Sequence, residues 1–403
     1  MKRTIVTAIA CGLAGLTGSV AAQEEPKTTF EVYGHVMLDM GHDFGQVDPL
    51  WYDVVRPTRL PSFEDEFAPS GNMYFGVRQT RFGVRSSTPT SAGPVKTHFE
   101  FELFGTGADA GQTTFRLRHA FGELGRFGAG QTWSVFMDAD VFPNSLEYWG
   151  PNGMVFFRNI QVRYMAVHGA SRYAVALERP GASGDGGVYA DRIELDDIRP
   201  HFPLPDLSAE GRLGGKWGYV ELAGMLRYIS WEDVGSDTFD LEGDAMGWGV
   251  NLSSNLKLGK NDVVRLQGVY GEAIQNYMND APADIGIASN PGGAPESPVT
   301  GEALPILGLV GFVDHTWSKR FSTSLGYSRI DIENSDLQDP SAFKSGQYAL
   351  LNLLYYPIDN VMMGIEGQWG QRENHSDGFS SDDWRLQLGF KYNFKHQWGG
   401  NDK

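Results

Sequence analysis

The chain has 403 residues, a formal net charge of −17 and a sequence pI of about 4.9. Because nucleic acid is itself strongly anionic, so acidic a chain is a poor ligand for it, and we expect no nucleic-acid partner. The 51 glycines and the aromatic content of 12% favour strands and turns over helices, and no stretch reaches the roughly 18–20 apolar residues of a membrane-spanning helix.

The N-terminus has the composition of a secretory signal. A basic pair is followed by an apolar run over 5–16 and by small residues at 19–22. This order predicts a signal peptide over 1–22, so we expect the protein to be exported. The only cysteine, Cys11, lies in that segment, and the mature chain therefore has no disulfide and no thiolate metal ligand.

The rest of the chain alternates apolar and polar residues with a period of two. In the run 383–394 every second residue is apolar, and the residues between are polar or glycine. Such alternation indicates strands with one apolar and one polar face, and it predicts about 16 of them. In chain order the predicted strands span 30–40, 72–86, 95–104, 113–124, 126–132, 154–166, 171–180, 206–214, 217–230, 246–258, 263–276, 306–318, 321–335, 346–357, 361–374 and 383–394.

The connections between these strands alternate between long and short. The segments 41–71, 133–153 and 181–205 are long, whereas the turns at 215–216 and 319–320 are very short. Outer-membrane barrels have this pattern, with short periplasmic turns and longer outer loops. The sequence therefore predicts an all-β fold, a 16-stranded antiparallel transmembrane β-barrel of the porin type in the outer membrane of a Gram-negative bacterium.

We expect the barrel to cover 30–394, after a short periplasmic segment at 23–29 and before a C-terminal tail at 395–403. An even number of strands puts both chain ends on the periplasmic side. A closed sheet leaves no backbone group unpaired in hydrocarbon, so the outer face of the barrel can contact outer-membrane lipid.

The alternation also assigns side chains to the two faces of the wall. In the strand 113–124, Phe115, Leu117 and Phe121 are expected to face lipid, with His119 on the same outward phase. Arg116 and Arg118 are expected to face the lumen, because an arginine on the lipid face costs roughly 2–4 kcal/mol at mid-bilayer. Over the clearly alternating strands, inward basic residues outnumber inward acidic ones, which predicts a mildly cationic lumen that favours anions.

The segment 133–153 is predicted to be the third outer loop and to fold into the barrel, where it narrows the pore. Its acidic residues are expected to face Arg116 and Arg118 across the pore and to create a transverse field there. The residues expected in this constriction loop are Trp133, Asp138, Asp140, Glu147, Tyr148 and Trp149.

Three segments strongly resemble the DcaP family of trimeric outer-membrane porins: KTHFEFELFG at 96–105, TFRLRHAFGELGRFGAGQTWSVFMD at 114–138 and YWGPNGMVFFRNIQVRYM at 148–165. The resemblance implies a homotrimer that lets small anionic solutes such as dicarboxylates diffuse, with selectivity from Arg116, Arg118 and Arg163. Some members of the family carry a coiled-coil stretch before the barrel. None is expected here, so trimer contacts must come from barrel walls and loops. The candidate pore-lining and anion-binding residues are Arg81, Lys96, Arg116, Arg118, Arg163 and Arg172.

Two alternatives remain open from the sequence. The inward charges could pair with one another and only brace the wall. The protein could be a sugar-selective or general diffusion channel with weak ion preference, using Trp133, Tyr148 and Trp149 to stack sugars. An enzyme is not expected, because the sequence has neither a nucleophile elbow nor a histidine pair at metal spacing, and we expect no cofactor and no metal.

Overall fold

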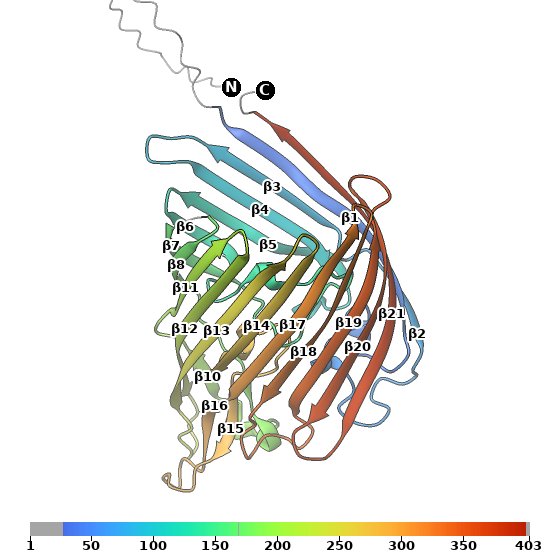
Figure 1. Cartoon of the computed structure of the whole chain (residues 1–403). Coiled ribbons are helices and arrows are strands. Elements are labelled where there is room, and N and C mark those ends of the chain that lie inside the picture. Colours follow the sequence, from blue (N-terminus) through green and yellow to red (C-terminus); the bar gives the residue numbers. More distant parts are fainter. Residues whose placement is uncertain (1–26, 168, 400–403) are drawn as a thin grey trace, which may run out of the picture.

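The computed structural model describes residues 27–167 and 169–399, which form a closed antiparallel barrel of 16 strands (Figure 1). The predicted signal peptide over 1–22 lies outside the described residues, as do 400–403 of the predicted tail. Within the described ranges, no helix is long and apolar enough to cross a membrane.

The barrel wall consists of sixteen spans, one of which is interrupted. β2 and β3 are the two parts of that span, because both pair with β1. The wall strands are β1 (Thr29–Asp43), β2 (Asn72–Gly76), β3 (Arg81–Thr88), β4 (Val95–Phe104), β5 (Thr113–Leu124), β6 (Phe127–Trp133), β7 (Arg158–Val167), β8 (Arg172–Glu178), β11 (Asp206–Gly215), β12 (Gly218–Asp233), β13 (Gly243–Leu258), β14 (Asp262–Glu272), β17 (Pro305–Ser318), β18 (Phe321–Ile332), β19 (Phe343–Tyr355), β20 (Val361–Asn374) and β21 (Ser380–Trp398).

Short elements occupy the long connections. β10 (Ile198–His201) extends the wall by pairing with β12, and β9 (Gly184–Asp185), β15 (Ile285–Ser289) and β16 (Val299–Ala303) form a separate small sheet. The single-turn helices are η1 (Pro49–Trp51), η2 (Pro57–Arg59), η3 (Gly107–Asp109), η4 (Ala139–Val141), η5 (Gly187–Tyr189), η6 (Ile193–Leu195) and η7 (Gln275–Tyr277).

The barrel closes between its first and last strands. β1 pairs with β21 along almost its full length, from Phe30 opposite Trp398 to Asp43 opposite Arg385. β21 therefore continues beyond Phe394 into the segment that was expected to be a tail. The start of β1 and the end of β21 lie at one end of the barrel, and β15 and β16 lie at the opposite end (Figure 1). An even strand number puts the start of β1 and the end of β21 on one side, and in outer-membrane barrels with short turns at that end this side is periplasmic.

The two faces of the wall follow the predicted alternation. Phe115 of β5 and Leu386 and Phe390 of β21 point outward and are 75%, 41% and 40% exposed. Arg385 and Gln387 of β21 are buried inside the barrel. Because apolar side chains cover the outer face and polar ones the inner face, the outer face is suited to lipid and the inner face to water.

A β-bulge overturns two side-chain assignments in β5. Glu100 lies opposite His119 but Phe101 lies opposite Leu117, so Arg118 is an extra residue in the ladder. A bulge shifts the two-residue period by one, and every side chain beyond it changes face. The prediction that His119 and Phe121 point outward is wrong, since they are 3% and 7% exposed and lie inside the barrel.

The predicted continuous strand 72–86 is also wrong at 77–80, where the ladder breaks between β2 and β3. Arg78 lies in this break and is fully buried. It donates hydrogen bonds to the Asp53 carboxylate at 2.5 Å and to the Gly105 carbonyl at 2.9 Å. Because the ladder breaks here, Arg78 and Arg81 both lie inside the barrel although they have opposite parity.

The lipid-facing assignment predicts that an outward arginine destabilises the protein more at the middle of the membrane than at its edge. Leu222 and Leu258 are both 55% exposed on the outer face. Leu222 of β12 lies between Trp217, just before the strand, and Tyr228, whereas Leu258 ends β13 beside a periplasmic turn. We expect Leu222→Arg to lower the free energy of unfolding by roughly 2–4 kcal/mol and Leu258→Arg by about 0–1 kcal/mol. Urea titrations in lipid vesicles measure both values, and equal losses would contradict a membrane-spanning wall.

Candidate functional site: the pore constriction

The segment 134–157 between β6 and β7 lies against the inside of the wall. Its side chains Phe136, Met154 and Val155 are fully buried and belong to one cluster with Val310 and Phe312 of β17. These wall residues point inward but are apolar, which suits a loop that packs on them rather than water. The third outer loop therefore occupies the lumen, and this packing explains an otherwise unexpected apolar stretch of inner wall.

Polar contacts fix the same loop to both sides of the barrel. The Asp138 carboxylate is fully buried, forms an ion pair with Arg212 at 2.5 Å and accepts hydrogen bonds from Tyr219 at 2.7 Å and Ser253 at 2.6 Å. On the far side, the backbone N–H groups of residues 146 and 147 donate to Glu366 of β20 at 2.8 and 3.0 Å.

The predicted opposition between loop acids and Arg116 or Arg118 is therefore wrong. Asp138 and Asp140 pair with Arg212 of β11, and the Asp140 carboxylate keeps more than half of its surface exposed. Glu147 is buried and accepts hydrogen bonds from the N–H groups of Val55 and Gly150. These acids anchor the loop, because each one contacts donors other than the arginines of β5.

Burial raises the pKa of the Glu147 carboxyl from its usual 4.5 to about 8, and the nearby Glu366 carboxylate adds to the rise. Because the neutral form is favoured in the folded loop, loop stability is greatest at acid pH and declines as the pH rises from about 4.5 through 8. Above pH 8 Glu147 adds negative charge beside the pore.

We expect any anion preference of the pore to fall between pH 6 and pH 9 as Glu147 ionises. Reversal potentials at each pH measure this preference. In Glu147→Gln the fall should be smaller, and an unchanged pH profile in that variant would contradict the assignment.

The arginines of the neighbouring wall share two carboxylates. The Arg118 guanidinium contacts Glu100 at 2.6 Å and Glu102 at 2.7 Å, and Arg81 and Arg116 lie 3.1 and 3.8 Å from Glu102. Tyr148 of the loop also donates to Glu102. A cavity of about 330 Å³ opens beside this cluster, between the loop and the wall, and Arg81, Arg118 and Lys391 line it.

Two cations at this site make no ion pair among the described residues. Lys391 of β21 lines the cavity, and the Arg158 guanidinium lies over the rings of Trp133 and Phe156, at 4.8 and 5.8 Å from their centroids. Lys391 is one of the polar residues of the alternating run 383–394 but is not among the candidates chosen from the sequence. Arg158 was missed because Arg163, which has the opposite parity, was assigned inward. Only the pairing of Trp133 with Arg158 across β6 and β7 reveals its place.

Several donors in this cluster are unused. One guanidinium nitrogen on each of Arg81, Arg116 and Arg158 is buried with no hydrogen-bond partner in the described part of the chain. Buried donors without partners are uncommon in folded proteins and indicate room for a ligand or water. An arginine can bind a carboxylate through two parallel hydrogen bonds, so this site is chemically suited to a carboxylate.

The remaining predicted basic residues lie elsewhere on the inner wall and are paired. Lys96 and Arg163 both lie within 4 Å of Glu123, at 3.6 and 3.7 Å, and line a second cavity. Arg172 contacts Glu210 at 3.3 Å and Glu221 at 3.0 Å. Arg163 and Arg172 each keep an Nε without a hydrogen bond. Their pairing is the wall-bracing arrangement that the sequence left open as an alternative.

The aromatic residues of the loop pack mainly on protein. The Tyr148 ring stacks on Phe104 at 4.0 Å with an interplanar angle of 11°, and Trp149 packs edge-on against Trp51. The Arg56 guanidinium lies between these two tryptophans, at 4.1 and 4.2 Å from their rings. Of the three aromatics, Trp133 and Tyr148 line the constriction cavity and Trp149 does not, so these residues form no continuous stacking surface.

Comparisons with known proteins agree with this architecture. The model of the DcaP outer membrane protein family matches residues 19–285. The crystal structure of the outer membrane channel DcaP of Acinetobacter baumannii is 20% identical, with a TM-score of 0.73, and the match covers 95% of this chain and 100% of that one. No curated protein matches the sequence.

Two further solved structures share the fold. The anion-selective porin from Comamonas acidovorans is 10% identical, with a TM-score of 0.59 and coverage of 91% of this chain and 100% of that one. The trimer form of OmpT, an outer membrane protein of Vibrio cholerae, is 13% identical, with a TM-score of 0.53 and coverage of 91% and 99%.

Proposed function

Since this chain belongs to the DcaP outer membrane protein family and folds as an outer-membrane porin, we propose that its pore prefers small anions, dicarboxylates among them. The observation that carries the proposal is an imbalance of charge at the constriction, where the cations outnumber the carboxylates. The cations are Arg81, Arg116, Arg118, Arg158 and Lys391, and the carboxylates are Glu100 and Glu102.

A cation excess at the narrowest part of a pore lowers the barrier for anions and raises it for cations. Glu147 also borders the cavity, but its raised pKa keeps it mostly uncharged at neutral pH, so it does not cancel the excess. The acids of the wall are already shared among several guanidinium groups, which leaves donor capacity for a solute.

The arrangement suits a solute with two carboxylates. Cations from β3, β5 and β21 line one cavity, so two separated carboxylates of one small molecule can each meet a different cation. Passage is by passive diffusion, and binding must be weak enough to permit release on the other side.

We further propose that the protein is a homotrimer embedded in outer-membrane lipid. The trimer form of a structurally similar porin supports this assembly, as does membership of the family. The exposed apolar residues of the outer face are suited to contact with lipid and with neighbouring subunits.

The test is the reversal potential of the reconstituted protein under a KCl gradient, together with block of the current by a dicarboxylate such as succinate. Anion preference with block by succinate supports the proposal. Weak ion preference with block by maltodextrin would favour the alternative of a sugar-selective or general diffusion channel.

A further inference from the structure

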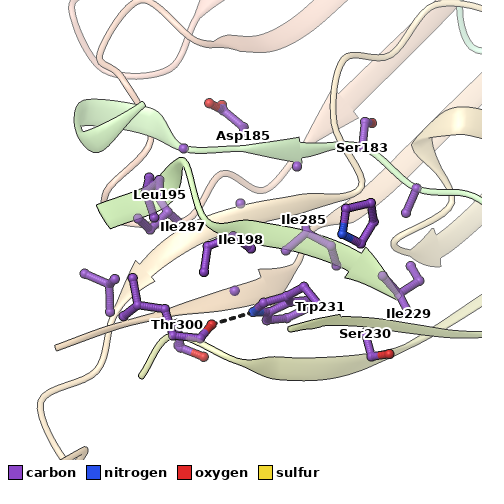
Figure 2. Close-up of a pocket in the computed structure, with 18 of the residues that line it drawn as sticks. Ser183, Asp185, Leu195, Ile198, Ile229, Ser230, Trp231, Ile285, Ile287 and Thr300 are labelled. Atoms are coloured by element: carbon purple, nitrogen blue, oxygen red, sulfur yellow. Dashed lines mark hydrogen bonds between the residues drawn. The ribbon is translucent and has the colours of Figure 1, made fainter. Parts of the chain in front are cut away.

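The outer loops enclose a cavity of about 330 Å³ that is separate from the constriction and mostly apolar (Figure 2). It lies between the small sheet of β9, β15 and β16 and the outer ends of β10 and β12. In Figure 2, Ser183 and Asp185 lie on one side of this space, and Ile229, Ser230 and Trp231 lie on the other.

Backbone pairing orders both sides of the cavity, which touch where Ile229 and Trp231 of β12 pack against β15 and β16. On one side β15 pairs with β9 in parallel, with Ile285 opposite Gly184, and with β16 in antiparallel fashion. On the other side β10 pairs with β12. Each side is a hydrogen-bonded sheet, so the space between them is part of the fold rather than a gap between loose loops.

The floor of the cavity is formed by Trp231. Its indole Nε1 donates to the Leu241 carbonyl at 2.8 Å, the bond drawn in Figure 2. The ring lies so close to Gly301 that a Cβ there would be only 2.5 Å from it. A side chain at this position would therefore displace the Trp231 ring.

The cavity is on the inner side of the wall. Ile229 and Trp231 have the same parity on β12 as Met225 and Arg227, which point into the barrel. The edge includes Thr300, which is exposed to solvent. Because the opposite face of β12 is the one that contacts lipid, an occupant of this cavity comes from the water at the outer mouth and not from a lipid chain.

The chemistry of the lining favours an uncharged ligand over an anion. Asp185 already accepts hydrogen bonds from the N–H of Gly187 at 2.9 Å and from Gln338 at 2.7 Å, and Ser230 donates to the His201 carbonyl at 2.8 Å. Most of the remaining surface is aliphatic or aromatic, from Leu195, Ile198, Ile229, Trp231, Ile285 and Ile287. With its polar groups largely satisfied and a carboxylate at the edge, the cavity repels anions and favours apolar contact.

We propose that this cavity is a binding site for a small, uncharged, largely apolar or aromatic molecule at the outer mouth. It shares no lining residue with the constriction cavity, so it is independent of the anion preference proposed above. Its volume falls in the range of known small-molecule pockets, about 300–1,000 Å³.

Gly184 offers a direct way to fill the cavity. A Cβ added there would meet only one atom within 4 Å, the Ile285 carbonyl oxygen at 4.0 Å, and the residue does not have a left-handed backbone. A leucine at this position would extend into the cavity. Gly181, in the same loop, would also accept a Cβ without contact but does not line the cavity, so Gly181→Leu is the matched control.

The experiment uses the full protein in lipid nanodiscs with 4-(trifluoromethyl)phenol, uncharged at pH 6.5, as the ¹⁹F NMR probe and empty nanodiscs as the baseline. We expect saturable binding to the wild type and to Gly181→Leu, and binding weaker by about tenfold or more in Gly184→Leu. If Gly184→Leu does not insert into the lipid bilayer, Thr300→Trp at the exposed edge is the second variant. It should weaken binding as well.

Equal saturable binding in all of these proteins, or none in the wild type, would overturn the proposal. Reversal potentials measured on the same samples should remain at the wild-type value. This readout separates a failure of the apolar site from a failure of the proposed anion preference.

Discussion

Replacing Arg158 and Lys391 together by glutamine will lower the anion preference of the pore by about tenfold or more. These two cations make no ion pair among the described residues, so their charge is available to a passing solute. A unit charge about 4 Å from an anion contributes about 1 kcal/mol in a water-like dielectric, which is a factor of about five for each cation. Reversal potentials under a KCl gradient measure the ratio.

The matched control is the double change Lys96→Gln and Arg163→Gln. It removes the same amount of charge from the lumen, but at a place where both cations lie beside Glu123 and away from the constriction cavity. We expect a clearly smaller loss of anion preference. If the two double variants lose the same amount, then total lumen charge sets selectivity and the constriction cluster has no special role.

Replacing Asp138 by alanine will release the third outer loop from one side of the barrel and increase the single-channel conductance. Its carboxylate accepts hydrogen bonds from Arg212, Tyr219 and Ser253, on β11, β12 and β13. Arg212 keeps Asp140 and Glu221 as partners, but the buried Tyr219 and Ser253 hydroxyls lose theirs, which costs about 1–3 kcal/mol for each unsatisfied group. Planar-bilayer recordings and swelling of liposomes in larger sugars measure the widened pore.

Asp140→Ala provides the control, because Asp140 pairs with the same arginine from an exposed position. An exposed ion pair contributes about 0–1 kcal/mol, so conductance should stay near the wild-type value. A wild-type conductance in a correctly inserted Asp138→Ala protein would mean that the apolar packing of Phe136 and Met154 holds the loop by itself.

For Glu147, the local sequence pattern predicts the position of the side chain but not its protonation state. The sequence identified an acidic residue in an inward loop, and the structure places it there. Its chemical state, however, depends on burial against Val55 from another loop and on Glu366 from a strand more than 200 positions away. No local pattern contains that information.

The sequence by itself determined the class of fold, the number of wall spans, the side of the termini and the two faces of strands such as β21. Those features depend on the two-residue period and on loop lengths, which are local. The tertiary structure alone decided that Arg118 is an extra residue in its ladder, that His119 and Phe121 point inward, and that Arg158 lies beside Trp133. Register is a property of two strands together, and an ion pair depends on which partner lies nearest across the lumen, so neither can be read from one strand.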